Sequence, residues 1–241
     1  MLWALLLLSG AGMAGAAAQR VTGLGSGLVA APFFVLVLGP FQGVLLANVL
    51  SLINSVVILA LTRRDVEVGK ALLLSVPAVG LGVPIGVVVV HRVPVRVLAV
   101  GVALLIIAAL LAVIFSDRAR VFRGPAGAVA AGSLSGFMNV TAGVGGPAIA
   151  LYAISVSWPH RNLVPTVQLY AIVLNLVSIA AKGPLDIPLP TMSLALASMG
   201  IGIALGSLLA KVVPPSAAQR AFIGLAFFGA VATLVKALLG Q

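Results

Sequence analysis

The chain has 241 residues, of which 62% are hydrophobic and only 7% are charged, and its formal net charge is +10. Soluble domains usually carry about 25% charged residues, so this composition excludes an ordinary soluble fold. The absence of cysteine excludes disulfides and thiolate chemistry, and two histidines are too few for a metal or haem cluster. We therefore predict no metal and no cofactor.

The first element in chain order is an apolar segment at 2–39, interrupted at 19–27 by "QRVTGLGSG". Its first eighteen residues end in small side chains, as a signal peptide does. No positive charge precedes them, and a matching segment occurs later, so we expect them to be retained as structure. A nucleotide-binding interpretation of the glycines fails, because no strand precedes them and no acidic residue follows about 20 positions on.

Three uninterrupted spans follow, at 41–62, 71–90 and 97–115. Each has about the 20 residues that cross a hydrocarbon core of ~30 Å. The basic stretch "SDRARVFRG" then leads into a second interrupted segment at 125–156, broken by "NVTAGVGGP", and three more spans, one of them at 191–210. The chain is predicted to be an all-α polytopic membrane protein.

The sequence overlays itself at an offset of 120 positions. Gly23 and Gly25 fall on Gly143 and Gly145, and Pro94 falls on Pro214 without a gap. We interpret this as a duplication with a first repeat at 1–120 and a second repeat at 121–241, together one membrane domain. Each half is a glycine-broken helical segment followed by three transmembrane helices.

The basic residues indicate how the halves are oriented. If each broken segment is a hairpin, each half crosses an odd number of times and the repeats are inverted. The connections at 63–70, 116–125, 157–162 and 211–220 then share one face with nine Lys or Arg, and four lie on the other: Arg92, Arg96, Lys182 and Lys236. If each broken segment instead crosses the membrane once, the Lys and Arg residues divide eight to five between the two faces. The larger difference agrees better with the positive-inside rule, which therefore favours inverted over parallel repeats. The same rule explains the net charge without nucleic acid.

The breaks themselves predict a binding site. Glycine costs ~1 kcal/mol per helix position and proline ~3, so two such clusters indicate non-helical backbone. Lipid cannot hydrogen-bond that backbone, which must face protein or water. Paired broken segments in two repeats point to a transporter's site at mid-membrane. Helices beginning near Leu28 and Pro147 would direct their positive dipole ends inward and bind an anion there.

Polar side chains near the breaks are candidate lining residues. "ANVLSLINSVV" places Asn48 and Ser51 on one helix face, and "VQLYAIVLNLVS" places Gln168 and Asn175 on the matching face. Hydrogen bonding between helices is the alternative for each. Arg20, the basic residue expected deepest in the membrane, either binds the anion or extends to an interface. The predicted substrate-binding residues are Arg20, Thr22, Gly23, Gly25, Ser26, Gly27, Asn48, Ser51, Asn139, Thr141, Gly143, Gly145, Gly146, Gln168 and Asn175.

For the repeated pairs Gly82/Gly86 and Gly202/Gly206 we expect close helix packing instead of binding. All four acids, Asp65, Glu67, Asp117 and Asp186, fall in connections. No embedded carboxylate is therefore available for a proton relay or a sodium site. Export of an anion is downhill by ~2.3 kcal/mol per charge per 100 mV without a coupling ion.

The chain resembles the sulfite exporter TauE/SafE family of bacterial permeases. The resemblance rests on the stretches "GLGSGLVAAPFF", "GVGGPAIALY" and "ANVLSLINS" and on the duplication. The resemblance implies transport of sulfite, sulfonates or related small oxyanions across the inner membrane. It leaves the particular anion, the direction and the coupling open. Ser26 stands where the family pattern often has glycine.

Other functions remain as alternatives. One is a channel-like or structural membrane subunit without oxyanion selectivity. The sequence shows neither the ring of acidic residues nor the selectivity filter that a cation channel would need. An intramembrane enzyme is disfavoured, because both histidines lie in connections and the required serine spacing and embedded acids are absent. The expected partners are the anion and the lipid bilayer, with no nucleic acid, and the oligomeric state is open between monomer and homodimer.

Overall fold

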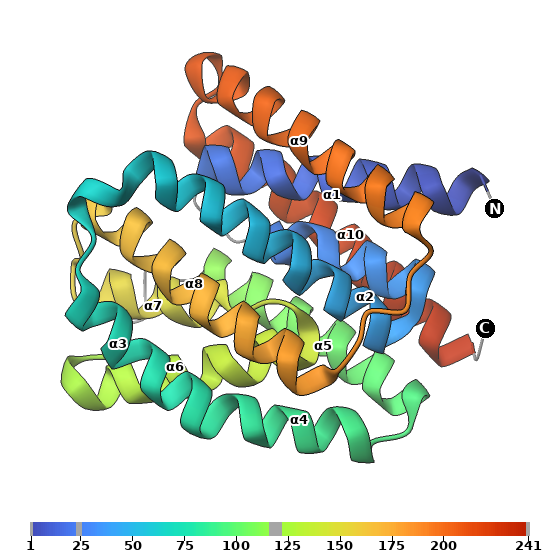
Figure 1. Ribbon diagram of the computed structural model, residues 1–241, viewed down its shortest axis with the longest axis horizontal. Coiled ribbons are helices and arrows are strands. Elements are labelled where there is room, and N and C mark those ends of the chain that lie inside the picture. The colour runs from blue at the N-terminus through green and yellow to red at the C-terminus, as the bar shows by residue number, and fades with distance from the viewer. Residues whose placement is uncertain (1, 23–25, 116–121, 240–241) are drawn as a thin grey trace.

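The computed structural model describes residues 2–22, 26–115 and 122–239, and these residues form helices joined by short connections (Figure 1). The helices in chain order are α1 Leu2–Thr22, α2 Ser26–Thr62, α3 Val68–Pro77, α4 Val83–Arg92, α5 Val95–Ile114, α6 Gly124–Ala142, α7 Gly146–Ser155, α8 His160–Lys182, α9 Leu189–Val212 and α10 Pro215–Leu239. A 3-10 turn, η1 Arg63–Asp65, follows α2, and a π turn, η2 Ala78–Gly82, joins α3 to α4. The described residues contain no strand.

Most helix boundaries lie close to the sequence predictions. The span predicted at 71–90 is α3, η2 and α4 in one continuous run, and the span predicted at 97–115 is α5. The first broken segment was predicted to end at residue 39, and there α2 has a kink, with Gly39 at φ 79° and ψ 170°. Glycine adopts this positive φ without the steric penalty that a side chain would bring, and the proline that follows cannot donate to the helix ladder.

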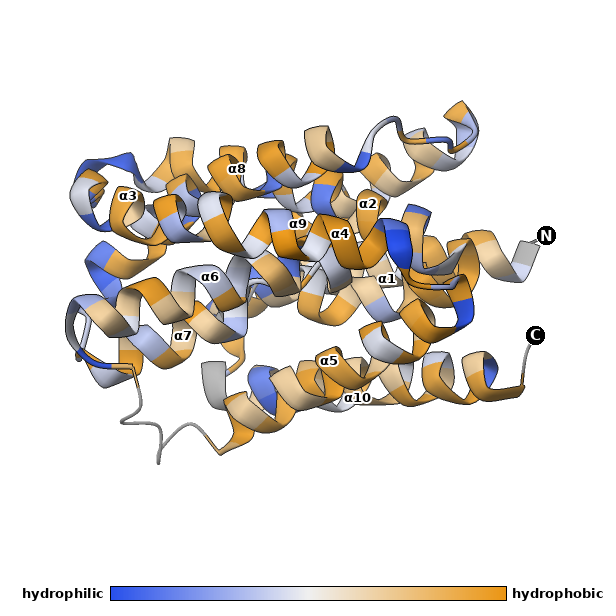
Figure 2. Cartoon of the chain, turned by 90° about the horizontal axis from the view of Figure 1, so that it is seen from below, coloured by the Kyte–Doolittle hydropathy of each residue, from blue (hydrophilic) through white to orange (hydrophobic). Residues whose placement is uncertain are grey.

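The outer surface of the helical bundle is apolar. Large hydrophobic side chains such as Val76, Leu189, Val212 and Phe228 are exposed. In Figure 2 hydrophobic colour covers most of the long helices, and the hydrophilic residues gather mainly at their ends. Within the described ranges seven helices are long and apolar enough to cross a membrane. Because water would make such a surface costly and lipid would not, the chain is a multi-pass membrane protein.

The two broken segments form two helical hairpins. One consists of α1 and the start of α2, and the other of α6 and α7. Figure 1 shows α1 extending inward from the N-terminal end of the molecule and α6 from the opposite end. The helices of the two halves also start at matching places: α2 and α7 begin at 26 and 146, and α5 and α10 at 95 and 215. The duplication into 1–120 and 121–241 stays a prediction.

The repeated glycine pairs lie where helices meet. A Cβ on Gly82 would be 2.1 Å from the carbonyl oxygen of Ser133 in α6, and one on Gly202 would be 2.3 Å from that of Met13 in α1. Side chains at these positions would therefore force the backbones apart. The prediction that these glycines serve helix packing is confirmed.

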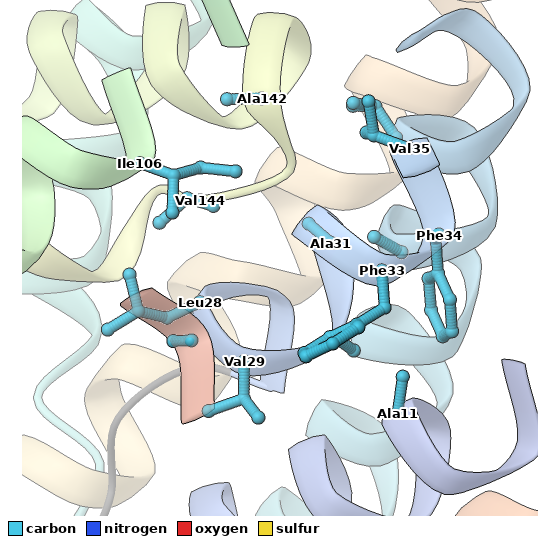
Figure 3. Packing of buried hydrophobic residues seen from close by; sticks show 14 of the residues in the cluster. Ala11, Leu28, Val29, Ala31, Phe33, Phe34, Val35, Ile106, Ala142 and Val144 are labelled. Carbon is cyan, nitrogen blue, oxygen red and sulfur yellow. The ribbon is translucent and has the colours of Figure 1, made fainter. Parts of the chain in front are cut away.

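The ends of the hairpins pack into the apolar core. Figure 3 shows Leu28 at the start of α2 and Ala142 and Val144 at the end of α6 in one cluster with Ile106 of α5. Ile106 and Ala142 are fully buried. Apolar side chains thus cover the hairpin ends from the α5 side, which leaves the opposite side for polar contacts.

A polar cluster joins the connection after α2 to the connection before α8. The backbone N–H of Glu67 donates to Oγ1 of Thr166 at 2.9 Å, and Nε1 of Trp158 donates to the Glu67 carboxylate at 2.6 Å. Nζ of Lys70 lies 3.0 Å from the same carboxylate and 4.8 Å from the Trp158 ring centroid. Arg161 and Asp65 add an ion pair of 2.9 Å nearby.

The Glu67 contacts predict a pH dependence of stability. The pKa of Glu67 lies below its ordinary value, chiefly because Lys70 donates a hydrogen bond to it, with Trp158 adding to the effect and burial opposing it. A lowered folded-state pKa gives stability that is complete above about pH 4.5 and is lost as the pH falls through the folded value. We expect the thermal midpoint in detergent to fall by a few degrees in that window. Glu67→Gln should show a smaller fall, and an equal fall would contradict the prediction.

Candidate functional site

A cavity of about 180 Å³ lies between the ends of the two hairpins and helix α8. Its wall includes α1 at Gln19, the start of α2, the middle of α2 at Ser51 and Ser55, the junction of α6 and α7, and a long face of α8 from His160 to Asn175. His160 is exposed and lines the cavity, so the cavity reaches the surface at the N-terminal end of α8. Segments from both halves of the chain thus surround one space.

The second break is built by a glycine that ends α6. Gly143 has φ 71° and ψ 18°, the left-handed conformation that glycine adopts most readily. Its N–H donates to Asn139 O at 2.9 Å, and the N–H of Val144 donates to Met138 O at 3.3 Å. The first of these hydrogen bonds is the 5→1 bond of the αL motif, which ends a helix at a residue in this conformation. The chain then reverses into α7 within three residues.

The N-terminus of α7 faces the cavity. Gly145, Gly146 and Pro147 all line it, and Pro147 occupies the first turn, where its missing N–H is not needed. The N-cap residue is glycine, so no side chain caps the first amides of the helix. These amides have no acceptor within the helix, and they carry the positive end of the helix dipole.

The two breaks contact each other directly. A Cβ built on Gly27, in the first turn of α2, would lie 1.9 Å from the carbonyl oxygen of Gly143. Only glycine at residue 27 permits this approach of backbone to backbone. The contact brings the N-terminus of α2 to the same cavity as the N-terminus of α7, because Gly27 and Leu28 also line it.

A buried amide, Gln19, holds the first hairpin to both long polar helices. Its Oε1 accepts from the backbone N–H of Ser26 at 2.9 Å and from Nδ2 of Asn54 at 2.8 Å. Its Nε2 donates to Oε1 of Gln168 on α8 at 3.1 Å. Ser26 and Ser51 add a hydroxyl–hydroxyl bond of 2.9 Å. One side chain therefore fixes the start of α2 and positions Gln168.

The second hairpin is held in a similar way by Asn139. Its Nδ2 donates to Oδ1 of Asn175 at 3.2 Å and to Oγ of Ser178 at 3.1 Å, both on α8. Asn139 lies 120 positions after Gln19, the offset at which the sequence overlays itself. Corresponding residues thus attach the two hairpins to neighbouring polar side chains.

The sequence analysis did not identify Ser135 and Tyr170, which lie beside α7. Oγ of Ser135 donates to the carbonyl oxygen of Gly145 at 2.7 Å, and the Tyr170 hydroxyl donates to Oγ of Ser135 at 2.7 Å. This chain fixes the backbone just before α7. The available signal was Tyr170 itself, since a buried tyrosine hydroxyl normally has a hydrogen-bond partner. His160, at the cavity mouth, carried no signal beyond its place in a connection.

The cavity offers hydrogen-bond donors. None of the described residues that line it is acidic. Of the acids, Asp65 is paired with Arg161, Glu67 is held by Lys70 and Trp158, and Asp186 is exposed in a connection. Helix N-termini and amide groups without a nearby carboxylate are suited to a small anion.

The structure brings eight of the predicted site residues to the cavity wall and leaves others away from it. The eight are Gly27, Ser51, Asn139, Gly143, Gly145, Gly146, Gln168 and Asn175. Ser26 lies just behind the wall through its bond to Ser51. Thr141 donates to Phe137 O on its own helix, and Asn48 is fully buried away from the cavity. Gly23 and Gly25 lie outside the described residues, as does the side chain of Thr22.

Two basic residues, Arg20 and Lys182, lie away from the cavity wall. Arg20 is exposed and its Nε donates to Oγ of Ser207 on α9 at 3.0 Å, so it does not line the cavity. The depth of Arg20 in the membrane stays a prediction. Among the described Lys and Arg residues the most buried is Lys182, at the end of α8, whose exposed fraction is 5%. The sequence analysis counted Lys182 with Arg92, Arg96 and Lys236 on the second face.

Comparison with known proteins agrees with this architecture. The family model described as "Sulfite exporter TauE/SafE" matches residues 8–233. The chain belongs to the sulfite exporter TauE/SafE family. The match includes all the residues that line the cavity, and it identifies this TauE/SafE protein as a member of a family of membrane transporters. Neither a curated protein nor a solved structure shows a significant match to the chain.

Proposed function

We propose that this TauE/SafE protein is a permease for small oxyanions of the sulfite and sulfonate class, located in the cytoplasmic membrane. The observation that carries the proposal is the uncapped N-terminus of α7 beside the first turn of α2 in one acid-free cavity. Two helix ends can bind an anion through backbone amides without a buried cation. The volume of about 180 Å³ is below the ~300–1,000 Å³ of clefts for drug-sized ligands, which favours a small substrate.

The proposed anion lies between the hairpins, with amides of α7 on one side and the side-chain amides of Gln168 and Asn175 on the other. Nε2 of Gln168 is free to turn toward the anion, because its Oε1 accepts from Gln19. The Ser51 hydroxyl adds a donor when Ser26 donates to it, and Asn139 positions Asn175. Direct hydrogen bonds from neutral groups suit a substrate that must be released again, since a fixed buried cation would hold it more tightly.

The proposed repeats are inverted, and the cavity opens to the cytoplasm. The hairpins extend from opposite ends of the molecule, as inverted repeats require (Figure 1). The cavity mouth at His160 lies on the face whose connections hold nine Lys or Arg. By the positive-inside rule that face is cytoplasmic. The structure then corresponds to a form that loads anion from inside the cell.

Export would be driven by the membrane potential. A singly charged anion that leaves an inside-negative cell gains ~2.3 kcal/mol per 100 mV. The part of the cavity wall that the structure describes has no carboxylate to bind a sodium ion or relay a proton, so this proposal needs no coupling ion. The lipid bilayer and the anion are the partners it requires, and a homodimer is compatible with it.

The test is sulfite efflux from proteoliposomes of the purified protein, with the membrane potential set by a potassium gradient and valinomycin. We expect saturable efflux that rises when the receiving side is made positive, with competition by methanesulfonate. Liposomes without protein serve as the control. Absence of efflux for sulfite and for a panel of sulfonates would refute the proposal, and non-saturable efflux of chloride and sulfite alike would indicate a channel.

A further inference from the structure

A line of buried polar residues on α8 continues past the cavity. Gln168, Asn175 and Lys182 are spaced seven residues apart and so share one helix face, with Ser178 between the last two. All four are buried, with exposed fractions of 5% or less. Gln168 and Asn175 line the cavity, whereas Ser178 and Lys182 lie beyond it. The polar face therefore extends from the cytoplasmic cavity toward the other side of the molecule.

The length of this face can be estimated from helix geometry. At 1.5 Å per residue Lys182 lies about 21 Å along α8 from Gln168. The amide N–H of Asp186, four residues after Lys182, donates to Oε1 of Gln42 near the kink of α2. Lys182 is thus at the end of the bundle opposite His160, close to where α2 changes direction.

The ammonium group of Lys182 has no protein partner. Its Nζ is buried and makes no hydrogen bond, and the two ion pairs among the described residues involve other groups. Lysine near a helix C-terminus is common because it can bond the last carbonyls, but here no such bond forms. A buried charge without a partner is costly, so a purely structural role does not explain the residue.

Lys236 on α10 shows what a structural lysine looks like at the same end of the molecule. Its Nζ donates to the carbonyl oxygen of Leu36 at 2.8 Å. That carbonyl lies four residues before Pro40, whose missing N–H leaves it without a helix partner. Lys236 therefore supplies the hydrogen bond that the Leu36 carbonyl lacks at the kink of α2. Lys182 donates to no such carbonyl.

We propose that Lys182 forms a second oxyanion site, at the exit end of the pathway, which an anion occupies after leaving the central cavity. The proposal rests on the permease function above. The ammonium would be the charged ligand, and Ser178 and Asn175 would connect the exit site to the cavity along the face of α8. Asn48 supports such a route, because its amide is fully buried outside the cavity and both its polar atoms lack partners.

The position of Asn48 along the helix axes also agrees with that route. Asn54 of α2 and Gln168 of α8 both bond Gln19 and so lie at one level. The two helices run in opposite directions, since the end of α2 and the start of α8 meet at the Glu67 cluster. Six residues before Asn54 thus corresponds to six after Gln168, which places Asn48 level with Leu174, at the end of the cavity nearer to Lys182.

The first test is thermal unfolding of wild type, Lys182→Met and Lys236→Met in detergent without anionic lipid. In gluconate buffer we expect Lys182→Met to unfold several degrees above wild type, because it removes an unpaired buried charge, and Lys236→Met to unfold below it. Added sulfite should raise the midpoint of wild type and of Lys182→Arg at least twice as much as that of Lys182→Met. A midpoint of Lys182→Met below wild type, or an equal rise with sulfite, would overturn the proposal.

The second test measures sulfite flux from each side of oriented proteoliposomes. Lys182→Met should raise the half-saturating concentration on the Lys182 side about ten- to a hundredfold, the range for a lost charged hydrogen bond, and leave the His160 side unchanged. An equal effect on both sides would overturn the proposal. If phosphatidylglycerol rather than sulfite produces the thermal shift, Lys182 binds lipid headgroups and the proposal is also overturned.

The two proposals fail separately. Wild type that carries no sulfite refutes the permease function, while the thermal comparison still decides whether Lys182 binds an oxyanion. Wild type that carries sulfite, with Lys182→Met indistinguishable from it in both tests, refutes only the exit site.

Discussion

Replacing Gln168 with glutamate is expected to reduce sulfite efflux at least about a hundredfold while the protein stays folded. Glutamate has the shape of glutamine, and its carboxylate still accepts the hydrogen bond from Nε2 of Gln19. Two like charges 4 Å apart at an effective dielectric constant of 20 repel by about 4 kcal/mol, or three orders of magnitude in binding. The measurement is efflux at a fixed potential together with the thermal midpoint.

Two variants separate charge from shape in this experiment. Gln168→Leu removes the polar group without adding charge and should reduce efflux less than Gln168→Glu. Gln219→Glu, on α10 and away from the cavity wall, adds the same charge elsewhere and should leave efflux within about twofold of wild type. Efflux of Gln168→Glu equal to that of Gln168→Leu would mean that no anion passes near residue 168.

Replacing Gly27 with alanine is expected to destabilise the protein and to abolish transport together. The added Cβ would lie 1.9 Å from the carbonyl oxygen of Gly143, a backbone atom that cannot rotate away. The hairpins must then separate, and overpacking of this kind typically costs ~1–3 kcal/mol. We expect a lower thermal midpoint and loss of sulfite efflux, because the helix N-termini of α2 and α7 no longer meet.

Gly101→Ala in α5 is the matched control. A Cβ at residue 101 would have no atom within 4 Å, so alanine there should be neutral or stabilising by ~0.5–1 kcal/mol. Its efflux should equal that of wild type. Wild-type stability and efflux in Gly27→Ala would show that the contact between the breaks is dispensable, and would remove the basis for a shared site.

The prediction of the helices succeeded where local chemistry decides the outcome. Long apolar runs become spans because a bilayer needs about 20 residues, and α5 and α9 begin within two residues of the predicted positions. The second break falls at its glycine cluster because glycine and proline disfavour helix at the residue itself. Gly143 in its left-handed conformation is the clearest example.

The sequence predicted part of the cavity wall, while substrate binding by the wall residues stays a prediction. Gln168 and Asn175 were identified from their spacing on one helix face, and both line the cavity. The same reasoning chose Asn48, which is buried elsewhere, and did not rank Gln19, whose three hydrogen bonds organise the first hairpin. Helical spacing tells which residues share a face, but not which neighbour that face meets.

The sequence by itself determined that this is a membrane protein with two broken helical segments, because composition, hydrophobic length and the conformational cost of glycine and proline act locally. Only the tertiary structure decided that the breaks touch at Gly27 and Gly143, that Arg20 faces Ser207 on α9, and that Lys182 is buried without a partner. Those outcomes depend on which helices become neighbours, and residues more than 100 positions apart in the chain supply the contacts.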